Sequence, residues 1–145
     1  MFKFKKHNIC PLCNKESKKV SSLTIKSMIK NEYKKNMTNF EGFHFCSNAN
    51  CNVIYFQEEK IIKQCELIKK VGLKEWTNPK TICYCFNLTK EKIIESLLLH
   101  GKNYVLNNIK KKMNKSACDC KRNNPSGQCC LKDINKTINE LRMVL

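Results

Sequence analysis

The sequence is poor in the residues that mark several common protein classes. Glycine occurs only 4 times and proline 3 times in 145 residues, so there is no glycine-rich phosphate loop and no low-complexity segment. No apolar run approaches the roughly 18–20 residues that cross a bilayer, and the densest stretch, residues 93–99, contains Glu95 and Ser96. The basic N-terminus is not followed by the apolar segment of a signal peptide. We therefore expect a cytoplasmic protein with no membrane insertion.

Acidic residues and arginine are also scarce. The chain has 28 basic and 12 acidic residues, a formal net charge of +16, yet Arg122 and Arg142 are its only arginines. Because arginine is the residue that clamps phosphates and reads bases through paired hydrogen bonds, nucleic-acid binding is disfavoured. Two metal sites with four thiolates each would lower the charge to about +12, which still attracts an acidic partner.

Cysteine is the abundant residue, with 11 in 145 positions. The odd count, the tight spacing and the missing export signal favour metal ligation over disulfides. Halves of about 70 residues also have small cores, and domains of that size often depend on a bound metal. Metal binding is therefore the leading hypothesis.

The pattern along the chain predicts an α+β fold in two subdomains, residues 1–75 and residues 76–145. In the first, strands over 43–45 and 53–56 flank a turn at 47–50, a third strand begins at Ile61, and a short helix covers 23–33. Gly72 and Pro79 interrupt the pattern near the boundary.

The second subdomain is expected to be mostly helical. After an extended run over 81–86, Thr89 caps a helix that Gly101 closes. The next helix carries inward-facing residues, and a loop over 116–130 leads to a last helix whose apolar positions recur at helical spacing. The inward-facing positions are Tyr104, Val105 and Ile109 in the first of these helices, and Leu131, Ile134, Ile138 and Leu141 in the last.

Two cysteine pairs in the first subdomain predict a zinc site. Cys10 and Cys13 form a C-x2-C knuckle, and Cys46 and Cys51 flank the turn between the expected strands. Four thiolates at about 2.3 Å from one zinc ion make a closed, structural tetrahedron. The alternatives are a redox-active dithiol or plain buried thiols. His7 and His44 lie near these ligands in sequence and are alternative donors.

The remaining cysteines predict a second centre of less certain type. Cys83 and Cys85 form a C-x-C pair, which is an awkward bite for one tetrahedral ion but suits one iron of a cluster. Downstream thiols complete the set, at Cys118, Cys120, Cys129 and Cys130. Spacing alone leaves a [2Fe–2S] cluster, a second zinc and structural or redox cysteines open. Cys65 stands between the sites and is expected to be a small buried residue.

Specific motifs resemble the N-terminal module of CopZ-type copper chaperones over almost the whole chain. In the first half they are Cys10-Pro-Leu-Cys13, the cysteine pair at 46 and 51, the strand at 53–56 and the segment Val71-Gly-Leu-Lys-Glu75. In the second half they are Cys83-Tyr-Cys-Phe86 and Cys120-Lys-Arg-Asn-Asn-Pro-Ser-Gly-Gln-Cys-Cys130. The family module joins a small zinc-stabilised β-rich subdomain to a mostly helical [2Fe–2S] subdomain similar to bacterioferritin-associated ferredoxin.

The resemblance implies a ligand set for each centre. Zinc would be held by Cys10, Cys13, Cys46 and Cys51, and the cluster by Cys83, Cys85, Cys120 and Cys130. Cys118 competes with Cys120, and Cys129 competes with Cys130 but is expected to point away.

The function implied is one-electron transfer linked to copper homeostasis, with reduction of Cu(II) to Cu(I) for transfer and no other enzymatic activity. Expected partners are a redox partner and a copper carrier or copper-transporting ATPase. One feature departs from the family, because these 145 residues contain no M-x-C-x-x-C copper loop, which argues against direct Cu(I) delivery by the usual site. Two alternatives remain: a Cu(I) metallochaperone that uses the surplus thiols Cys118 and Cys129, and a zinc-stabilised protein or nucleic-acid adaptor.

Overall fold

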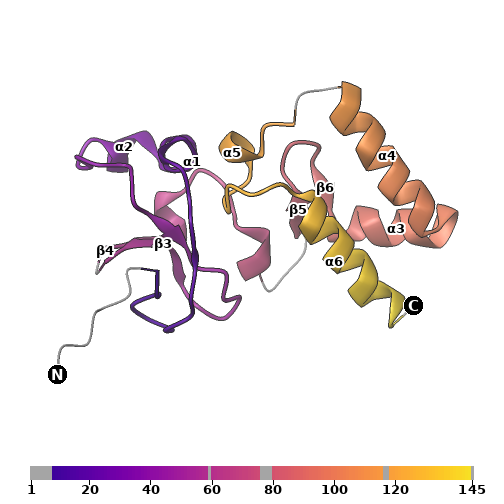
Figure 1. Ribbon diagram of the computed structural model, residues 1–145, viewed down its shortest axis with the longest axis horizontal. Coiled ribbons are helices and arrows are strands. Elements are labelled where there is room, and N and C mark those ends of the chain that lie inside the picture. Colours follow the sequence, from indigo (N-terminus) through magenta and orange to yellow (C-terminus); the bar gives the residue numbers. More distant parts are fainter. Residues whose placement is uncertain (1–7, 59, 76–79, 116–117, 145) are drawn as a thin grey trace.

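The chain folds into a β-rich half followed by a helical half, and the two halves lie side by side along the long axis of the molecule (Figure 1). The structure, a computed structural model, describes residues 8–58, 60–75, 80–115 and 118–144. This arrangement confirms the α+β class. The expected boundary after residue 75 adjoins residues 76–79, which lie outside the described part of the chain.

The first half is built on a four-stranded antiparallel sheet. Its strands follow chain order, β1 (Lys18–Lys19), β2 (His44–Phe45), β3 (Val53–Gln57) and β4 (Lys60–Lys63), as the sequence predicts for the last three. The central strand β3 is buried along most of its length because it packs against two clusters. One cluster contains Ile54 and Tyr55, and the other combines Val53 and Phe56 with cysteines.

The single helix predicted over 23–33 is wrong at its centre. The chain instead forms α1 (Ser22–Met28) and α2 (Asn31–Lys34), separated by an extended Ile29. Ile29 forms a β-bridge with Leu67, and the Lys30 amide donates to the Glu66 carbonyl at 2.8 Å. A partner distant in sequence therefore replaces the local helical hydrogen bonds.

Short elements connect the halves and frame the second centre. Two 3-10 turns, η1 (Gln64–Glu66) and η2 (Gly72–Lys74), precede the two-stranded sheet of β5 (Thr81–Cys83) and β6 (Leu88–Thr89). Cys65 lies on η1 and is exposed, so the expectation that it is buried is wrong. A short turn without an apolar face gives its side chain nothing to pack against.

Three longer helices and one short helix complete the second half: α3 (Lys90–His100), α4 (Lys102–Lys115), α5 (Cys120–Asn123) and α6 (Leu131–Arg142). Thr89 caps α3 and Gly101, with a φ of 82°, ends it, as predicted. Val105 and Ile109 are buried, but Tyr104 is 48% exposed and does not face inward.

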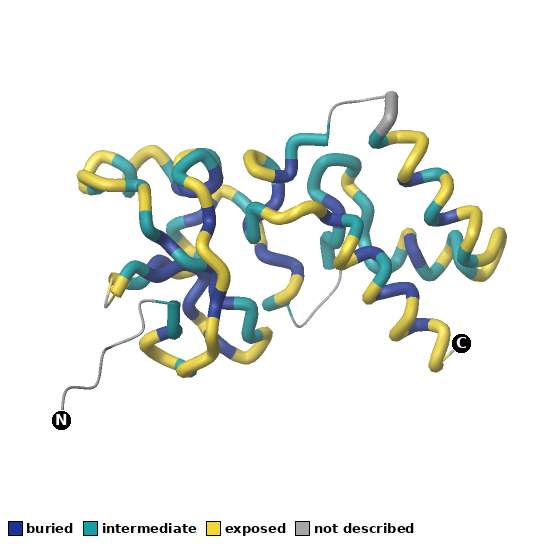
Figure 2. The backbone as a smooth tube through the Cα atoms, viewed as in Figure 1, coloured by how far each residue is buried: buried dark blue, intermediate teal, exposed yellow. Residues whose placement is uncertain are grey.

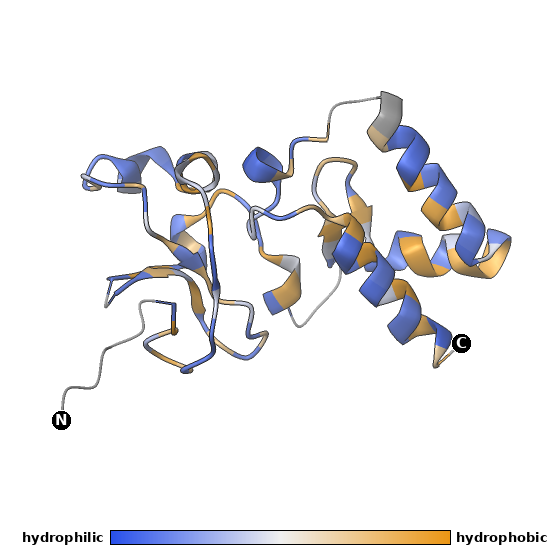
Figure 3. Cartoon of the chain, in the orientation of Figure 1, coloured by the Kyte–Doolittle hydropathy of each residue, from blue (hydrophilic) through white to orange (hydrophobic). Residues whose placement is uncertain are grey.

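Helix α6 is amphipathic. Ile134, Ile138 and Leu141 are buried. Buried positions recur along the helix (Figure 2), while most of its visible face is hydrophilic (Figure 3). Among the described helices, none has the length and apolar character required to span a membrane.

Candidate metal centres

The four cysteines predicted to bind zinc lie together in the first half. The sulfurs of Cys10, Cys13, Cys46 and Cys51 are all within 4.8 Å of one another. The sulfurs of Cys10 and Cys51 are 3.9 Å apart, and those of Cys13 and Cys46 are 3.6 Å apart. A tetrahedral zinc with bonds of about 2.3 Å separates its sulfurs by about 3.8 Å. The donor set therefore fits one zinc ion.

Two tight turns aim these thiols at a common point. In the first, the Asn14 amide donates to the Cys10 carbonyl at 2.9 Å, and Asn14 has a left-handed φ of 61°. In the second, the Cys51 amide donates to the Asn48 carbonyl at 3.1 Å. Asparagine tolerates such backbone conformations and forms local side-chain hydrogen bonds, which explains its presence in both turns.

Hydrogen bonds and burial give the thiols of this site different pKa values. Burial raises the pKa of Cys13, but hydrogen bonds at Lys15 and Asn48 outweigh it and lower the pKa to about 6. Burial raises the pKa of Cys46 to about 12, against the opposing effects of a backbone hydrogen bond at Asn48 and the charge of Lys74. Bound zinc supplies the positive charge that keeps every ligating thiol deprotonated.

Lys74 connects the zinc site to η2, in the segment between the two halves. Its Nζ donates to the main-chain carbonyls of Asn48 at 2.8 Å and Cys51 at 3.0 Å. The lysine comes from η2, so one cation both neutralises nearby thiolate charge and fixes the turn that carries two ligands.

The structure does not bring His44, the candidate histidine among the described residues, into the sulfur group. His44 stacks against Phe56 with ring centroids 5.5 Å apart and is absent from the group of four cysteines. His7 lies outside the described residues.

The second half gathers five thiols where several elements meet. Cys83 ends β5, Cys85 lies in the turn before β6, Cys120 begins α5 and Cys130 precedes α6. The sulfur of Cys120 lies 3.7 Å from that of Cys85 and 3.6 Å from that of Cys130. Cys130 is in turn hydrogen-bonded to Cys83. The four predicted cluster ligands thus form a row of neighbouring sulfurs.

The other two thiols differ in position. The Cys118 sulfur lies 3.1 Å from that of Cys120 and 3.7 Å from that of Cys85. These three sulfurs are all within 4.8 Å of one another. Cys129 is exposed and belongs to neither sulfur group of the described residues, as its expected orientation away from Cys130 implies.

Two asparagines donate to sulfurs of the second centre. The Nδ2 of Asn124 lies 3.2 Å from the Cys130 sulfur, and the Nδ2 of Asn123 lies 3.6 Å from the Cys85 sulfur. Asn124 is buried, and its Oδ1 accepts from the amide and hydroxyl of Ser126 at 3.0 and 2.9 Å. The sequence places Asn124 only within the loop over 116–130, because spacing shows no contact between its amide and a thiol.

The buried thiols of Cys83 and Cys130 shift each other's pKa in opposite directions. The hydrogen bond from Cys130 lowers the pKa of Cys83 to about 6, against the opposing effect of burial. The same hydrogen bond, together with burial, raises the pKa of Cys130 well above its ordinary value. A metal that binds here must displace the proton of each thiol that is not already ionised.

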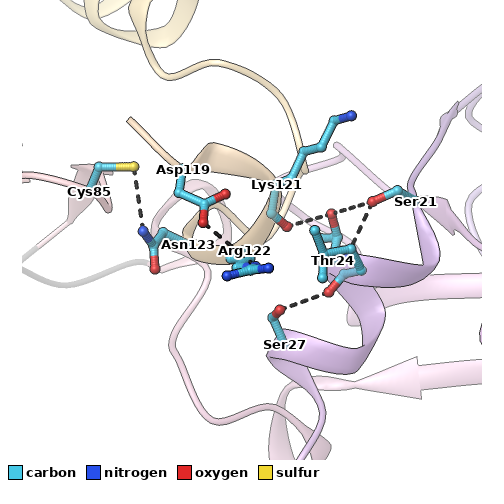
Figure 4. A network of polar contacts seen from close by, with 9 residues as sticks. Ser21, Thr24, Ser27, Cys85, Asp119, Lys121, Arg122 and Asn123 are labelled. Atoms are coloured by element: carbon cyan, nitrogen blue, oxygen red, sulfur yellow. Dashed lines mark hydrogen bonds and ion pairs between the residues drawn. The ribbon is translucent and has the colours of Figure 1, made fainter. Parts of the chain in front are cut away.

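The first half holds the loop that carries these ligands through three side-chain hydrogen bonds. Thr24 donates to the carbonyl of Lys121 at 2.7 Å, Lys69 to that of Asn123 at 3.1 Å, and the Tyr55 hydroxyl to that of Pro125. Figure 4 shows the contact between Thr24 and Lys121 beside the bond from Asn123 to Cys85. The two metal centres are therefore mechanically connected.

Comparison with known proteins supplies relatives for both halves. Residues 7–68 match the family described as "zf_CopZ: Zinc binding domain". The chain is 34% identical over 122 residues to "Copper chaperone CopZ" of Archaeoglobus fulgidus, which is 83% of this chain and 57% of that relative. The chain thus spans little more than half of the relative's length.

A solved structure resembles most of the fold. The X-ray structure of the Archaeoglobus fulgidus CopZ N-terminal domain matches with a TM-score of 0.74 and 31% identity, over 88% of this chain and 95% of that one. The match includes the helical half as well as the zinc-binding half, since it extends well beyond the 62 residues of the family match.

Proposed function

With the chain placed in the family of CopZ-type N-terminal modules, we propose that it is a metallochaperone module of copper homeostasis. In this proposal the first half holds a structural zinc, and the second half binds metal through its thiols. The observation that carries the proposal is the gathering of five sulfurs at one junction, those of Cys83, Cys85, Cys118, Cys120 and Cys130. Soft thiolate ligands favour Cu(I).

The sequence motifs and the named relative favour different functions. The motifs put electron transfer first and Cu(I) binding second, whereas the relative is named a copper chaperone. That name supports the Cu(I) alternative and says nothing of an iron–sulfur cluster or of Cu(II) reduction.

A [2Fe–2S] cluster on Cys83, Cys85, Cys120 and Cys130 is the second candidate. Of these four thiols, only Cys85 and Cys120 belong to a group with all sulfurs within 4.8 Å. A row of donors suits two bridged irons, each of which takes two thiolates, better than a single tetrahedral ion, whose ligands must converge as they do at the first centre. When bound, such a cluster supplies one-electron chemistry, including reduction of Cu(II) to Cu(I).

The protein's own residues would bind and orient rather than catalyse. Asn123 and Asn124 donate N–H groups to sulfurs, which stabilises thiolate charge, and Cys130, whose pKa is raised, loses its proton when metal binds. No acid–base step is needed. We therefore propose a non-enzymatic function, with cupric reduction as its only redox activity under the second candidate.

Two partners follow from the proposal. A copper-transporting ATPase or copper carrier would exchange Cu(I), and a redox partner is required only if the cluster is present. The net charge of +16 favours an acidic partner surface. An open groove of about 740 Å³ lies between the halves. The charged residues of its lining are five lysines and three carboxylates: Lys18, Lys80, Lys90, Lys132, Lys136, Glu16, Asp133 and Glu140.

The proposal keeps the division into residues 1–75 and residues 76–145. Separate clusters of buried hydrophobic residues support it, because those of the first half lie between Cys10 and Val71 and that of the second between Cys83 and Leu141. Two of these clusters contain thiols: one includes Cys10, Cys46 and Cys51, and the other includes Cys83, Cys120 and Cys130.

The test is metal analysis of protein purified without air, followed by Cu(I) titration against a chromogenic Cu(I) chelator. A metallochaperone module contains about one zinc per chain and takes Cu(I) from the chelator. A red-brown sample with about two irons and two sulfides per chain establishes the cluster. A colourless sample with about two zincs and no Cu(I) uptake contradicts the proposal and favours the zinc-stabilised adaptor.

A further inference from the structure

The segment from Cys120 to Cys130, here called the ligand loop, carries two N–H donors to other sulfurs of the second centre. The Nδ2 of Asn123 lies 3.6 Å from the Cys85 sulfur, and that of Asn124 lies 3.2 Å from the Cys130 sulfur. In the row of sulfurs, these two thiols lie on either side of Cys120. A [2Fe–2S] cluster held by the row would therefore receive hydrogen bonds at two of its four ligands.

Hydrogen bonds to ligand sulfurs affect the reduction potential of a cluster. Reduction adds one negative charge, so an N–H donor stabilises the reduced cluster more than the oxidised cluster and raises the potential. The effect depends on the distance and angle of each hydrogen bond, which the backbone of the ligand loop must hold constant. What fixes this backbone therefore contributes to the potential.

The zinc-binding half fixes the backbone on both sides of the two asparagines. Three of its side chains donate to carbonyls at positions 121, 123 and 125: Thr24 to Lys121 at 2.7 Å, Lys69 to Asn123 at 3.1 Å, and Tyr55 to Pro125. Figure 4 shows the first of these bonds beside the bond from Asn123 to Cys85. Helix α5, where the ligand loop begins, packs against α1 of the first half.

Two of these donors belong to the rigid interior of the first half. Thr24 and Tyr55 are both fully buried. Tyr55 lies on β3, whose Val53 and Phe56 pack in one cluster with cysteines of the zinc centre. A bound zinc ion thus stabilises the strand that holds the ligand loop.

We propose that the zinc-binding half sets the reduction potential of the cluster by fixing the donors Asn123 and Asn124, an inference that rests on the cluster candidate of the proposed function. Thr24 and Tyr55 are positioning residues, because they donate to carbonyls rather than to sulfurs. Without their bonds the ligand loop samples more conformations, and the asparagine donors spend less time at the sulfurs. The potential should then fall, because the reduced cluster loses more stabilisation than the oxidised one.

The test removes one hydroxyl at a time without a change in charge. Full-length Thr24→Val and Tyr55→Phe, loaded with zinc and iron, are titrated anaerobically with dithionite, and the visible absorbance of the cluster reports its midpoint potential. At a fixed potential, we expect the ratio of oxidised to reduced cluster to rise about threefold in each variant. Lys69 is left intact, because loss of its charge would itself lower the potential.

Two control substitutions match these variants. Thr24→Ser retains the hydroxyl that donates to Lys121. Tyr104→Phe removes the hydroxyl of a tyrosine on α4 whose side chain is 48% exposed. Both controls should keep the wild-type potential. Equal iron, sulfide and zinc content and equal circular dichroism show that each variant is loaded and folded, and Tyr55→Phe carries the comparison alone if Thr24→Val fails this check.

A double variant tests whether the hydroxyl acts through an asparagine. Asn123→Leu removes one donor directly and should raise the ratio of oxidised to reduced cluster about tenfold, which for one electron lowers the potential by about 59 mV. Adding Thr24→Val to Asn123→Leu should produce a smaller shift than Thr24→Val produces in the wild type, since the donor that it positions is already absent.

The failures are distinguishable. Wild-type potentials in both Thr24→Val and Tyr55→Phe, with cluster and zinc present, contradict this inference and leave the proposed function standing. An undiminished Thr24→Val shift in the Asn123→Leu background shows that the hydroxyl acts by another route, which also overturns it. Wild-type protein that holds no iron and sulfide after purification without air contradicts the cluster candidate and this inference together.

Discussion

The hydroxyl of Thr24 in α1 donates a 2.7 Å hydrogen bond to the main-chain carbonyl of Lys121 in α5. Thr24 is fully buried, and it also contacts the loop at Gly127, where an added Cβ would lie 2.9 Å from the Thr24 hydroxyl oxygen. Gly127 has a φ of 70°, so the position favours glycine on both counts. One side chain of the zinc-binding half thus fixes the start and the turn of the loop between Cys120 and Cys130.

Replacing this hydroxyl should destabilise the fold. Thr24→Val keeps the shape of the side chain but leaves the Lys121 carbonyl, in a part-buried contact, without this donor, which should cost about 1–3 kcal/mol in the free energy of unfolding. The measurement is urea unfolding of the zinc-loaded protein. Thr24→Ser retains the hydroxyl and serves as the control. A loss below about 0.5 kcal/mol in Thr24→Val would show that water replaces the bond.

Lys74 should contribute to zinc affinity although it is not a ligand. Lys74→Met removes the two hydrogen bonds to the Asn48 and Cys51 carbonyls and the charge that lowers the pKa of Cys46. We expect zinc to bind about tenfold more weakly, as measured by competition with a chromogenic chelator. The exposed Lys70 provides the matched control, Lys70→Met. Equal zinc affinity in both variants would refute the role of Lys74.

Asn124 should tune the second centre. Asn124→Asp keeps the oxygen that accepts from Ser126 but replaces the donor to Cys130 with a negative group. Repulsion between this carboxylate and the thiolate should lower metal affinity about 10–100-fold. The readout is the metal retained per chain after dialysis, and Asn107→Asp on the exposed face of α4 controls for the change in charge. Retention equal to that control would contradict the prediction.

Removing metal from the second centre should loosen α6. Cys130 directly precedes this helix, and Ile134 and Ile138 pack in the same cluster as Cys83 and Cys120. Because metal-binding free energy is also folding free energy in small domains, the metal-free protein should lose helical circular dichroism. Unchanged helicity would show that the hydrophobic cluster suffices to hold α6.

Two tyrosines, the buried Tyr55 and the partly buried Tyr84, should resist titration at alkaline pH. Burial raises the pKa of Tyr84 to about 12 and raises that of Tyr55 still further. The unfolded chain ionises near pH 10, so these groups contribute stability that is complete below about pH 10 and is lost as pH rises toward the folded-state pKa. The phenolate absorbance of Tyr55 and Tyr84 should therefore rise together with unfolding. Titration of all 4 tyrosines near pH 10 in a still-folded protein would contradict this.

Local spacing was sufficient to predict much of the architecture. The α3 cap at Thr89, its end at Gly101 and the buried stripe of α6 follow from hydrogen bonds and contacts within a few residues, so they were confirmed. The helix expected over 23–33 was interrupted because Ile29 pairs with Leu67, a partner that local periodicity does not reveal. The burial expected for Cys65 failed for a similar reason, since it depends on what η1 packs against.

The amino-acid sequence specifies the type of metal ligand and how the ligands are paired. The softness of a thiol and the separation of the two sulfurs in a C-x2-C or C-x-C pair are local properties, which depend on residue type and short-range spacing. Residue type and spacing therefore predict two cysteine centres from the sequence alone. The composition of the second centre is different, because sulfurs 33 and 35 residues apart meet there only through packing of β5, α5 and α6. Tertiary structure alone placed Cys118 inside the sulfur group and Cys129 outside it, aimed Asn124 at Cys130, and attached the ligand loop to the first half through Thr24. These contacts depend on the three-dimensional path of the chain, which no pattern of neighbouring residues encodes.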